Sequence, residues 1–445
     1  MLNKARRSIA PTPLPKVSHG AGSYVFDSSG KRYIDGSGGP AVYCLGHAHA
    51  EVNEAIRQQL ELIAHGYRYT FTSDPLIRLT ELIQSQAGPG FEQILYVSSG
   101  SEAVESALKI ALQFHWGKGD RKRTRFISRQ RSYHGNTLGA LAVSGFAQRR
   151  KQFEGSLFPC SFLSTANEYR PAIAGTAAQL TDYLAAELEQ EILKVGAENV
   201  AAFIFEPVVG AAGGMLPAPA GYAAKMRAVC TRYGVLMIAD EVMCGAGRCG
   251  SWRALAEEQV LPDIMTIAKG LGGGYVPLGA VAYSGRIAET IVAADGAVNT
   301  GHTFTGHTLA CASAAAVQQI VVRDRLIERV RSESAALRQR LVASVGELPA
   351  VGDLRVRGFF AGVELVADRD SRHPFDPDLK LAEIVRARTL QEGLICYPVS
   401  GTIDGVNGDV VIISPPYNAS DAELDEIADK LGRGLRLALA DIGAA

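Results

Sequence analysis

The chain has 445 residues and a formal net charge of −1 at pH 7, with 47% hydrophobic and 20% charged residues, an ordinary balance for a globular protein. This length exceeds a single hydrophobic core, so two or more domains are expected. The near-neutral charge gives no general attraction to nucleic acid or to a membrane surface. A nucleic-acid function would rest on two basic runs alone, Lys118–Arg125 and Arg149–Lys151, and the first is typical of a solvated loop.

The cysteine content indicates the redox compartment. Seven cysteines, an odd number, lie scattered in apolar or glycine-rich stretches, which fits a reducing compartment better than a disulfide framework. Cys244 and Cys249 have no second Cys or His pair at zinc-ligand spacing, so we predict no metal site. Met1–Ser8 contains no apolar core of a signal peptide, and no stretch reaches transmembrane length. We therefore expect a cytoplasmic protein.

The predicted elements begin with a hairpin at residues 22–36, where β-rich runs flank Asp27–Gly30. From about residue 70 to 320, short apolar runs alternate with amphipathic stretches, which predicts a mostly parallel sheet covered by helices. The expected strands are Gln93–Val97, Arg125–Ser128, Val200–Phe205, Val235–Ala239 and Ile264–Ala268. The expected helices are Ser101–Phe114, Ala218–Tyr233 and Leu309–Val322. A charged amphipathic helix follows from Arg323 to about Leu348, then a smaller α+β unit with strands near Phe359–Leu365 and Val410–Ile413.

Three of the expected strands end in an acid or a lysine. These residues are Glu206, Asp240 and Lys269, which follow the third, fourth and fifth strands. The carboxyl ends of parallel strands meet at one edge of a sheet, where ligands bind. A single acid at such a place can simply cap a helix. An acid and a lysine on neighbouring strands, beside a glycine turn, point to a shared site.

Lys269 lies in the glycine-rich segment 268–280, directly after an apolar run. Apolar surroundings disfavour the ammonium form, so the amine is easier to deprotonate and to use as a nucleophile. Such a lysine forms Schiff bases with aldehydes. The alternative interpretation is a surface lysine in a glycine-rich loop.

Two turns add parts of a binding site. Ser98–Ser101 opens a helix, where backbone N–H groups and the helix dipole favour an anion such as a phosphate, although an ordinary serine cap is the alternative. Tyr133 in the turn 132–135 offers an aromatic face for stacking a planar ring. A buried carboxylate at Asp240 would keep a pyridine nitrogen protonated. Together with Lys269, these are the groups that pyridoxal phosphate requires.

A family resemblance rests on motifs that run in order along nearly the whole chain. They are Ser-Gly-Ser-Glu-Ala (99–103), Tyr-His-Gly (133–135), Glu-Pro-Val (206–208), Asp-Glu-Val with Gly-x-Gly-Arg-x-Gly (240–250), Ala-Lys-Gly with Pro-Leu-Gly-Ala (268–280), His-Thr-Phe-Thr-Gly-His (302–307) and Arg-Gly-x-x-x-Gly (357–362). With these motifs the chain resembles a class III aminotransferase of the fold-type-I pyridoxal-phosphate superfamily, similar to the omega-transaminases.

The resemblance implies an α/β fold with a large and a small domain. The large domain, residues 61–322, would hold a mostly parallel, seven-stranded type of sheet covered by helices and would bind pyridoxal 5'-phosphate. The smaller α+β domain would be built from the N-terminal segment 1–60 and the C-terminal residues 323–445.

The resemblance also implies the role of each cofactor-site residue. Lys269, Asp240 and Tyr133 would be the catalytic residues, with Lys269 holding the cofactor as the internal aldimine and then moving a proton between substrate and cofactor carbons. Asp240 would pair with the ring nitrogen, and Tyr133 and Val242 would cover the two faces of the ring. Gly100 and Ser101 would bind the phosphate, and Ser99, His134 and Glu206 would make further contacts to the cofactor.

Thr303 would reach the phosphate of the neighbouring subunit, so the resemblance implies a homodimer. The alternative for Thr303 is a plain β-branched strand or turn residue.

The chain departs from the family pattern where a substrate carboxylate is usually bound. Two positions in the C-terminal domain commonly supply an arginine, and they hold Tyr397 and Ile412 here. Ala211 stands where relatives that mask their arginine have a glutamate. A carboxylate buried without a cation is costly. The substrate therefore lacks a nearby carboxylate, or another arginine binds it, with Arg68 and Arg355 as guesses, or backbone and hydroxyl groups bind it.

The segment Ser400–Asp409 is longer than the usual link at this place and is rich in turn formers. It either edges the substrate pocket or forms a plain surface hairpin.

The function implied by the resemblance is transfer of an amino group from an amine or omega-amino compound to a keto acid or aldehyde by a ping-pong mechanism. An aminomutase, racemase or decarboxylase with the same cofactor is the alternative, as is a non-catalytic homologue that binds the cofactor. The joint presence of Lys269, Asp240, Tyr133 and Thr303 argues against the non-catalytic homologue. No nucleic acid or membrane partner is expected.

Overall fold

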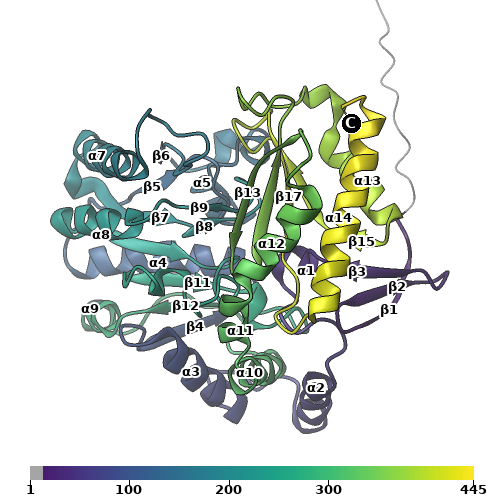
Figure 1. Cartoon of the computed structure of the whole chain (residues 1–445). Helices are drawn as coiled ribbons and strands as arrows, with labels where there is room; N and C mark the ends of the chain where they lie inside the picture. The colour runs from purple at the N-terminus through teal and green to yellow at the C-terminus, as the bar shows by residue number, and fades with distance from the viewer. Residues whose placement is uncertain (1–13, 445) are drawn as a thin grey trace, which may run out of the picture.

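A seven-stranded sheet forms the centre of the computed structural model, which describes residues 14–444 (Figure 1). Its order is β4-β12-β11-β10-β7-β5-β6. The strands are β4 (Gln93–Val97), β5 (Arg125–Arg129), β6 (Cys160–Leu163), β7 (Val200–Phe205), β10 (Leu236–Asp240), β11 (Ile264–Ile267) and β12 (Gly279–Tyr283). Strand β12 is antiparallel to β4 and β11, and the other neighbours are parallel. The expected mostly parallel sheet is confirmed, and no end of an expected strand is displaced by more than one residue.

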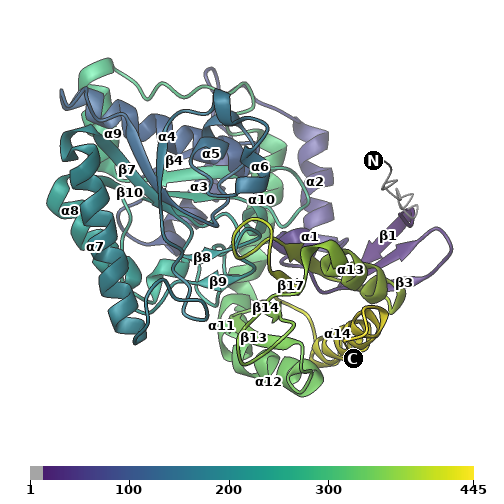
Figure 2. The same ribbon diagram turned by 90° about the horizontal axis from the view of Figure 1, so that it is seen from above.

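Helices cover both faces of this sheet, which explains why its central strands are continuous apolar runs. On β7, Ala202 and Ile204 pack with helix α4, whereas Phe203 and Phe205 pack with helices α7 and α8 on the other face. Figure 2 shows α7 and α8 running side by side along one flank. The covering helices are α4 (Gly100–Gly117), α7 (Ala177–Val195), α8 (Tyr222–Tyr233) and α9 (Gly285–Asp295).

A further group of helices packs beside the β4 edge, at the base of the view in Figure 1. These are α2 (Ala50–Leu62), α3 (Asp74–Ala87) and α10 (Thr308–Arg323), and α10 contacts both of the others. Their buried side chains belong to a core that continues into the smaller domain.

The smaller α+β domain combines both ends of the chain. One antiparallel sheet has the order β13-β14-β17-β16, and its strands are β13 (Val351–Arg357), β14 (Phe360–Leu365), β16 (Tyr397–Ser400) and β17 (Asp409–Ile413). A second sheet contains the expected hairpin and a strand from the C-terminal part, and consists of β1 (Val17–Ala21), β2 (Tyr24–Asp27), β3 (Arg32–Asp35) and β15 (Leu394–Ile395). Strands β3 and β15 are parallel. The N-terminal segment thus shares a sheet with the C-terminal third (Figure 1).

The single helix expected from Arg323 to about Leu348 is wrong. Helix α10 ends at Arg323, and the chain then forms α11 (Leu326–Ser332) and α12 (Ser334–Val345). Arg325 has φ of +51°, a left-handed conformation through which an α-helix does not continue.

Helix α8 begins at Tyr222 and not at Ala218, because Gly221 before it has φ of +75°. The remaining helices are α13 (Leu381–Gln391) and α14 (Asp421–Asp441), which pack on each other, and the short α1 (Gly38–Ala41), α5 (Leu138–Ala142) and α6 (Ala147–Arg150). The remaining strands are β8 (Val208–Val209) and β9 (Leu216–Pro217).

The expectation for Met1–Ser8 and the start of the predicted segment 1–60 lie outside the described residues. Within residues 14–444, no helix has both the length and the apolar character needed to cross a membrane. The domain limits at 60/61 and 322/323 stay predictions. The first of them falls inside α2, which packs on α10.

Candidate active site

The carboxyl ends of β4, β5, β7, β10 and β11 meet at one cavity of about 450 Å³. All of the predicted cofactor-site residues except Thr303 line it: Ser99, Gly100, Ser101, Tyr133, His134, Glu206, Asp240, Val242 and Lys269. Residues 39, 40 and 42 of the N-terminal segment and Tyr397 of the C-terminal part line it as well, so the cavity lies where the two domains meet.

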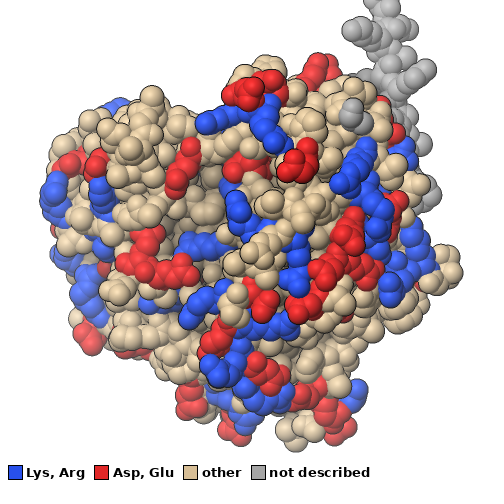
Figure 3. Space-filling view, viewed as in Figure 1, with Lys and Arg blue, Asp and Glu red and all other residues tan. Residues whose placement is uncertain are grey.

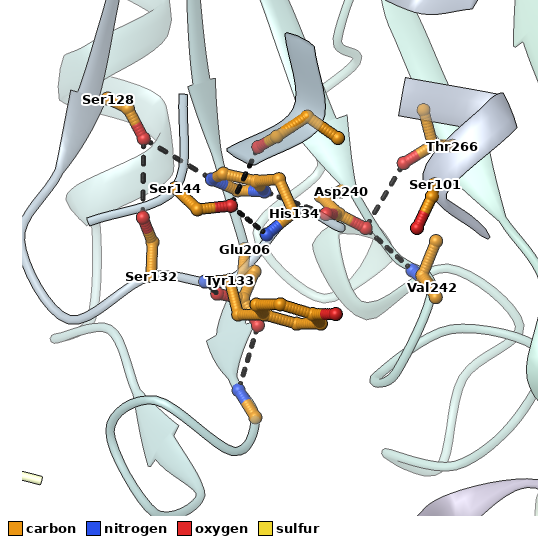
Figure 4. Close-up of polar contacts among 12 residues, drawn as sticks. Ser101, Ser128, Ser132, Tyr133, His134, Ser144, Glu206, Asp240, Val242 and Thr266 are labelled. Carbon is orange, nitrogen blue, oxygen red and sulfur yellow. Dashed lines mark hydrogen bonds and ion pairs between the residues drawn. The ribbon is translucent and has the colours of Figure 1, made fainter. Parts of the chain in front are cut away.

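The Asp240 carboxylate is buried and held from both sides (Figure 4). Its Oδ2 atom lies 2.7 Å from Nδ1 of His134. Its Oδ1 atom accepts hydrogen bonds from the backbone N–H of Val242 at 3.0 Å and from Oγ1 of Thr266 at 3.1 Å. On the far side of the ring, Nε2 of His134 lies 3.3 Å from Oγ of Ser128. These contacts hold the negatively charged carboxylate in one orientation at the end of β10, beside the cavity.

Lys269 follows β11 in a strained conformation, with φ of +45°. Its carbonyl accepts hydrogen bonds from the N–H groups of Gly272 and Gly273, which closes the turn. Desolvation lowers the pKa of the Lys269 amine, and the nearby charges of Asp240 and Glu206 oppose this shift. The site therefore presents an amine that gives up its proton more readily than an exposed lysine.

The first turn of α4 forms a cradle for an anion. Ser99 is the N-cap, and its Oγ accepts a hydrogen bond from a first-turn N–H at 3.2 Å, so the serine-cap alternative is also correct for this residue. A Cβ on Gly100 would lie 2.9 Å from Cγ1 of Val242, which leaves no room for a side chain. The N–H groups and dipole of an 18-residue helix face the cavity here and favour a negative charge.

Glu206 holds the backbone that carries the aromatic face. Its carboxylate accepts hydrogen bonds from the N–H of Tyr133 at 2.8 Å and from the N–H of Gly210 at 2.9 Å. Burial, with the nearby Asp240 charge, raises the pKa of Glu206. The Tyr133 ring is braced edge-on by Phe146, with 6.0 Å between ring centroids. Glu206 thereby keeps the Tyr133 ring in the cavity wall.

Thr303 is exposed and lies outside the cavity of its own chain. Phe304 beside it is 55% exposed, and Tyr69 and Phe71 are 69% and 66% exposed. Gly301 in the same turn lies next to the hydroxyl of Tyr69. Large apolar side chains are therefore left uncovered around Thr303 in the single chain.

The residues at the positions where the resemblance implies substrate-carboxylate binding are only partly in the cavity. Tyr397 and Ala211 line it, whereas Ile412 is buried in a core cluster behind it. Neither guessed arginine lines it. Arg355 pairs with Glu364 at 2.7 Å, and Arg68 borders a separate hollow next to α3.

The segment Ser400–Asp409 connects β16 to β17, and none of its residues lines the cavity. The expectation that it edges the pocket is wrong. Its Gly401 carbonyl accepts a hydrogen bond from Nη1 of Arg131 at 3.0 Å, which draws the hairpin onto the large domain.

Each of the two basic runs contains an arginine that is occupied by structural contacts. Arg123 donates to the carbonyls of Val200 and Tyr233, and Arg150 donates to three carbonyls near the end of α5. On the face drawn in Figure 3, Lys and Arg are interspersed with Asp and Glu. Within residues 14–444, no group of three or more His, Cys, Asp and Glu side chains is placed to hold a metal ion.

Sequence reasoning missed Phe146 and Arg149, which line the cavity beside Tyr133. Arg149 belongs to a basic run whose residues have different surroundings in the fold. The available sequence signal was its place three residues after Phe146, in the stretch that follows the Tyr133 turn.

The comparisons with known proteins agree with this geometry. The model of the family described as aminotransferase class-III matches residues 7–435. The chain is 40% identical to an aminotransferase of Gibberella zeae, over 97% of this chain and 86% of the relative, and 37% identical to the aminotransferase YodT of Bacillus subtilis, over 93% of each chain.

Solved structures give the same result for the fold. A thermostable (S)-enantioselective omega-transaminase from Thermomicrobium roseum is 36% identical with a TM-score of 0.89, covering 96% of this chain and 93% of that chain. An omega transaminase of Pseudomonas jessenii, in complex with PMP, is 30% identical with a TM-score of 0.90, covering 97% and 94%. The chain is therefore an enzyme of the class III aminotransferase family, with the fold of the omega-transaminases.

Proposed function

We propose that the chain transfers an amino group from an amine or omega-amino compound to a keto acid or aldehyde, in two half-reactions of a ping-pong mechanism, with pyridoxal phosphate as cofactor. The observation that carries this proposal is the meeting of Lys269, Asp240 and the N-terminus of α4 in one cavity. The Pseudomonas jessenii enzyme in complex with PMP, the aminated form of this cofactor, supports it.

The residues present fit pyridoxal phosphate. The first turn of α4, with Gly100 too crowded for a side chain, would hold the phosphate. Tyr133 and Val242 would lie against the two faces of the ring, and the Asp240 carboxylate would face its nitrogen. Ser99, Ser101, His134 and Glu206 would complete the site, His134 through Asp240 and Glu206 through the backbone of Tyr133.

The cofactor, when bound, supplies an electrophilic carbon and a ring that accepts electrons from the substrate carbon. Lys269 would attach the cofactor covalently, for which its lowered pKa provides the free amine. Once displaced by a substrate amine, Nζ of Lys269 would accept a proton from the substrate carbon and return it at a second position. The Asp240 carboxylate would stabilise the proton on the ring nitrogen. Its orientation needs no change for this, because three hydrogen-bonding partners already hold it in place.

The oligomeric state and the location of the protein also belong to this proposal. The exposed apolar side chains around Thr303 support a homodimer in which Thr303 reaches the phosphate of the partner's site. The seven cysteines, all present as free thiols, support a cytoplasmic location.

The test is a panel of amine donors with pyruvate or 2-oxoglutarate as acceptor. The reaction is monitored through the loss of the cofactor's absorbance and through the formation of product. Transfer that stops without an acceptor is expected, whereas continued turnover without any acceptor would indicate a racemase or decarboxylase. Borohydride reduction of the holoenzyme should fix the cofactor on Lys269, identified by peptide mass. Label on another lysine, or normal turnover by Lys269→Ala, would contradict the mechanism.

A further inference from the structure

The cavity contains one arginine. Among the residues that line it, Lys269 and Arg149 are the only lysine and arginine side chains. Lys269 is engaged by the proposed cofactor chemistry, so Arg149 is the cation that remains for a substrate.

Arg149 lies on α6 and is held by two aromatic rings. Its guanidinium carbon is 5.1 Å from the ring centroid of Tyr133 and 5.3 Å from that of Phe146. Stacking of this kind restricts the long side chain while its N–H groups stay available. Within the part of the chain that the structure describes, Arg149 makes no ion pair and no side-chain hydrogen bond.

The neighbouring arginines differ from Arg149 in this respect. Arg150 is buried, donates to carbonyls at the end of α5 and pairs with Glu154. Arg131 donates to the carbonyls of Gly401 and Gly145. The contacts of Arg150 anchor α6, and Arg149 on the same helix is exposed and lines the cavity with its charge unpaired.

Tyr397 contributes a second polar group on this side. It lines the cavity at a position where the family resemblance implies an arginine, and it lies close enough to Arg149 for the guanidinium to oppose the rise in its pKa that burial causes. The tyrosine stays protonated at neutral pH and offers an O–H donor beside the guanidinium.

We propose that Arg149 binds the carboxylate of the substrate, so that α6 of the large domain supplies the cation that relatives take from the C-terminal domain. The substrate class is then an amino or keto compound that carries a carboxylate. A guanidinium presents paired N–H donors that match the two carboxylate oxygens. This inference rests on the proposed function, because it assigns the substrate of the same site.

The first test compares Arg149→Met with Lys151→Met, an exposed cation two residues away that does not line the cavity. The acceptors are pyruvate, with its carboxylate next to the reacting carbon, succinate semialdehyde, with a distant one, and benzaldehyde, with none. Arg149→Met should raise KM for one or both carboxylate acceptors about 10- to 100-fold, the range for a lost charged hydrogen bond at a partly exposed site.

Whether the KM for pyruvate or that for succinate semialdehyde rises shows how far the bound carboxylate lies from the reacting carbon. The kcat values, the KM for benzaldehyde and all constants of Lys151→Met should stay close to those of the unmodified enzyme, and Arg149→Lys should recover only part of the loss. An unchanged KM for both carboxylate acceptors, or an equal rise for benzaldehyde, would overturn the proposal.

The second test measures binding without turnover. Propionate, which has a carboxylate but no reacting group, is titrated into the holoenzyme by calorimetry. Its affinity should fall about 10-fold or more in Arg149→Met and not in Lys151→Met. Equal affinities would refute the role of Arg149. Failure of the aminotransferase proposal would instead appear as absent transfer with Lys269 unlabelled by borohydride, while the propionate difference remained.

Discussion

Asp240→Asn is expected to slow amino transfer far more than it destabilises the fold. The asparagine side chain has the same shape, so its carbonyl still accepts from Val242 or Thr266. Its amide donates to Nδ1 of His134 if that ring carries its proton on Nε2, which faces Ser128. The substitution thus keeps most of the hydrogen bonds and removes only the negative charge.

The magnitudes follow from these contacts. Weakening one charged hydrogen bond in a buried network should lower the free energy of unfolding by about 1–3 kcal/mol. Loss of the charge opposite a protonated ring nitrogen should raise the reaction barrier by about 3 kcal/mol, since both groups are shielded from water. A barrier change of that size lowers kcat roughly 100-fold.

The assay measures kcat of purified holoenzyme with a saturating donor and acceptor, and Tm by calorimetry. Thr266→Val is the matched control, because it removes one hydrogen bond to Asp240 and leaves the charge in place. We expect its kcat to fall less than about 10-fold. A kcat of Asp240→Asn within a few-fold of the unmodified enzyme, or an equal loss in Thr266→Val, would refute the role given to the charge.

The other predictions concern the cradle, pH and assembly. Gly100→Ala places a Cβ 2.9 Å from Val242, so cofactor retention on dialysis should fall about 10-fold. The free energy of unfolding should change by less than about 2 kcal/mol, because overpacking opposes the gain in helix propensity. Full retention of the cofactor would contradict the role of this turn in phosphate binding. Burial raises the pKa of Glu241 from 4.5 to about 7, so the native state keeps a proton that the unfolded state has lost. The resulting stabilisation is complete below pH 4.5 and is lost as the pH rises to 7, by about 3 kcal/mol; urea unfolding should show a flatter pH dependence for Glu241→Gln, and an unchanged slope would count against it. Mixed dimers of Lys269→Ala and Thr303→Ala should be more active than the sum of the two separate variants, since one of their sites is intact; simple additivity would argue against a shared site.

The sequence by itself determined the fold and most of the cavity. Val200–Phe205 and Leu236–Asp240 are apolar on both faces, and such strands are stable only when helices cover a parallel sheet on both sides. Because parallel strands align their carboxyl ends, Glu206, Asp240 and Lys269 had to meet once those strands were identified. Strand ends thus predicted Glu206, Asp240 and Lys269, and turn chemistry predicted Ser98–Ser101 and Tyr133, whereas Val242 and His134 came from the family resemblance.

The tertiary structure decided what local sequence does not encode. Arg149 and Arg150 are adjacent cations of one basic run, yet one stacks on Tyr133 beside the cavity and the other binds the end of α5. The break at Arg325 between α10 and α11 likewise depends on where the chain must turn into the smaller domain.

The pairing of His134 with Asp240 joins residues 106 positions apart. Arg355, a guess for a substrate-binding arginine, pairs with Glu364, and Ile412, at a position where the resemblance implies an arginine, is buried in a core cluster. The physical reason is common to these cases. Periodicity and turn chemistry act over a few residues, whereas the partner of a long polar side chain is selected by the packing of the whole fold.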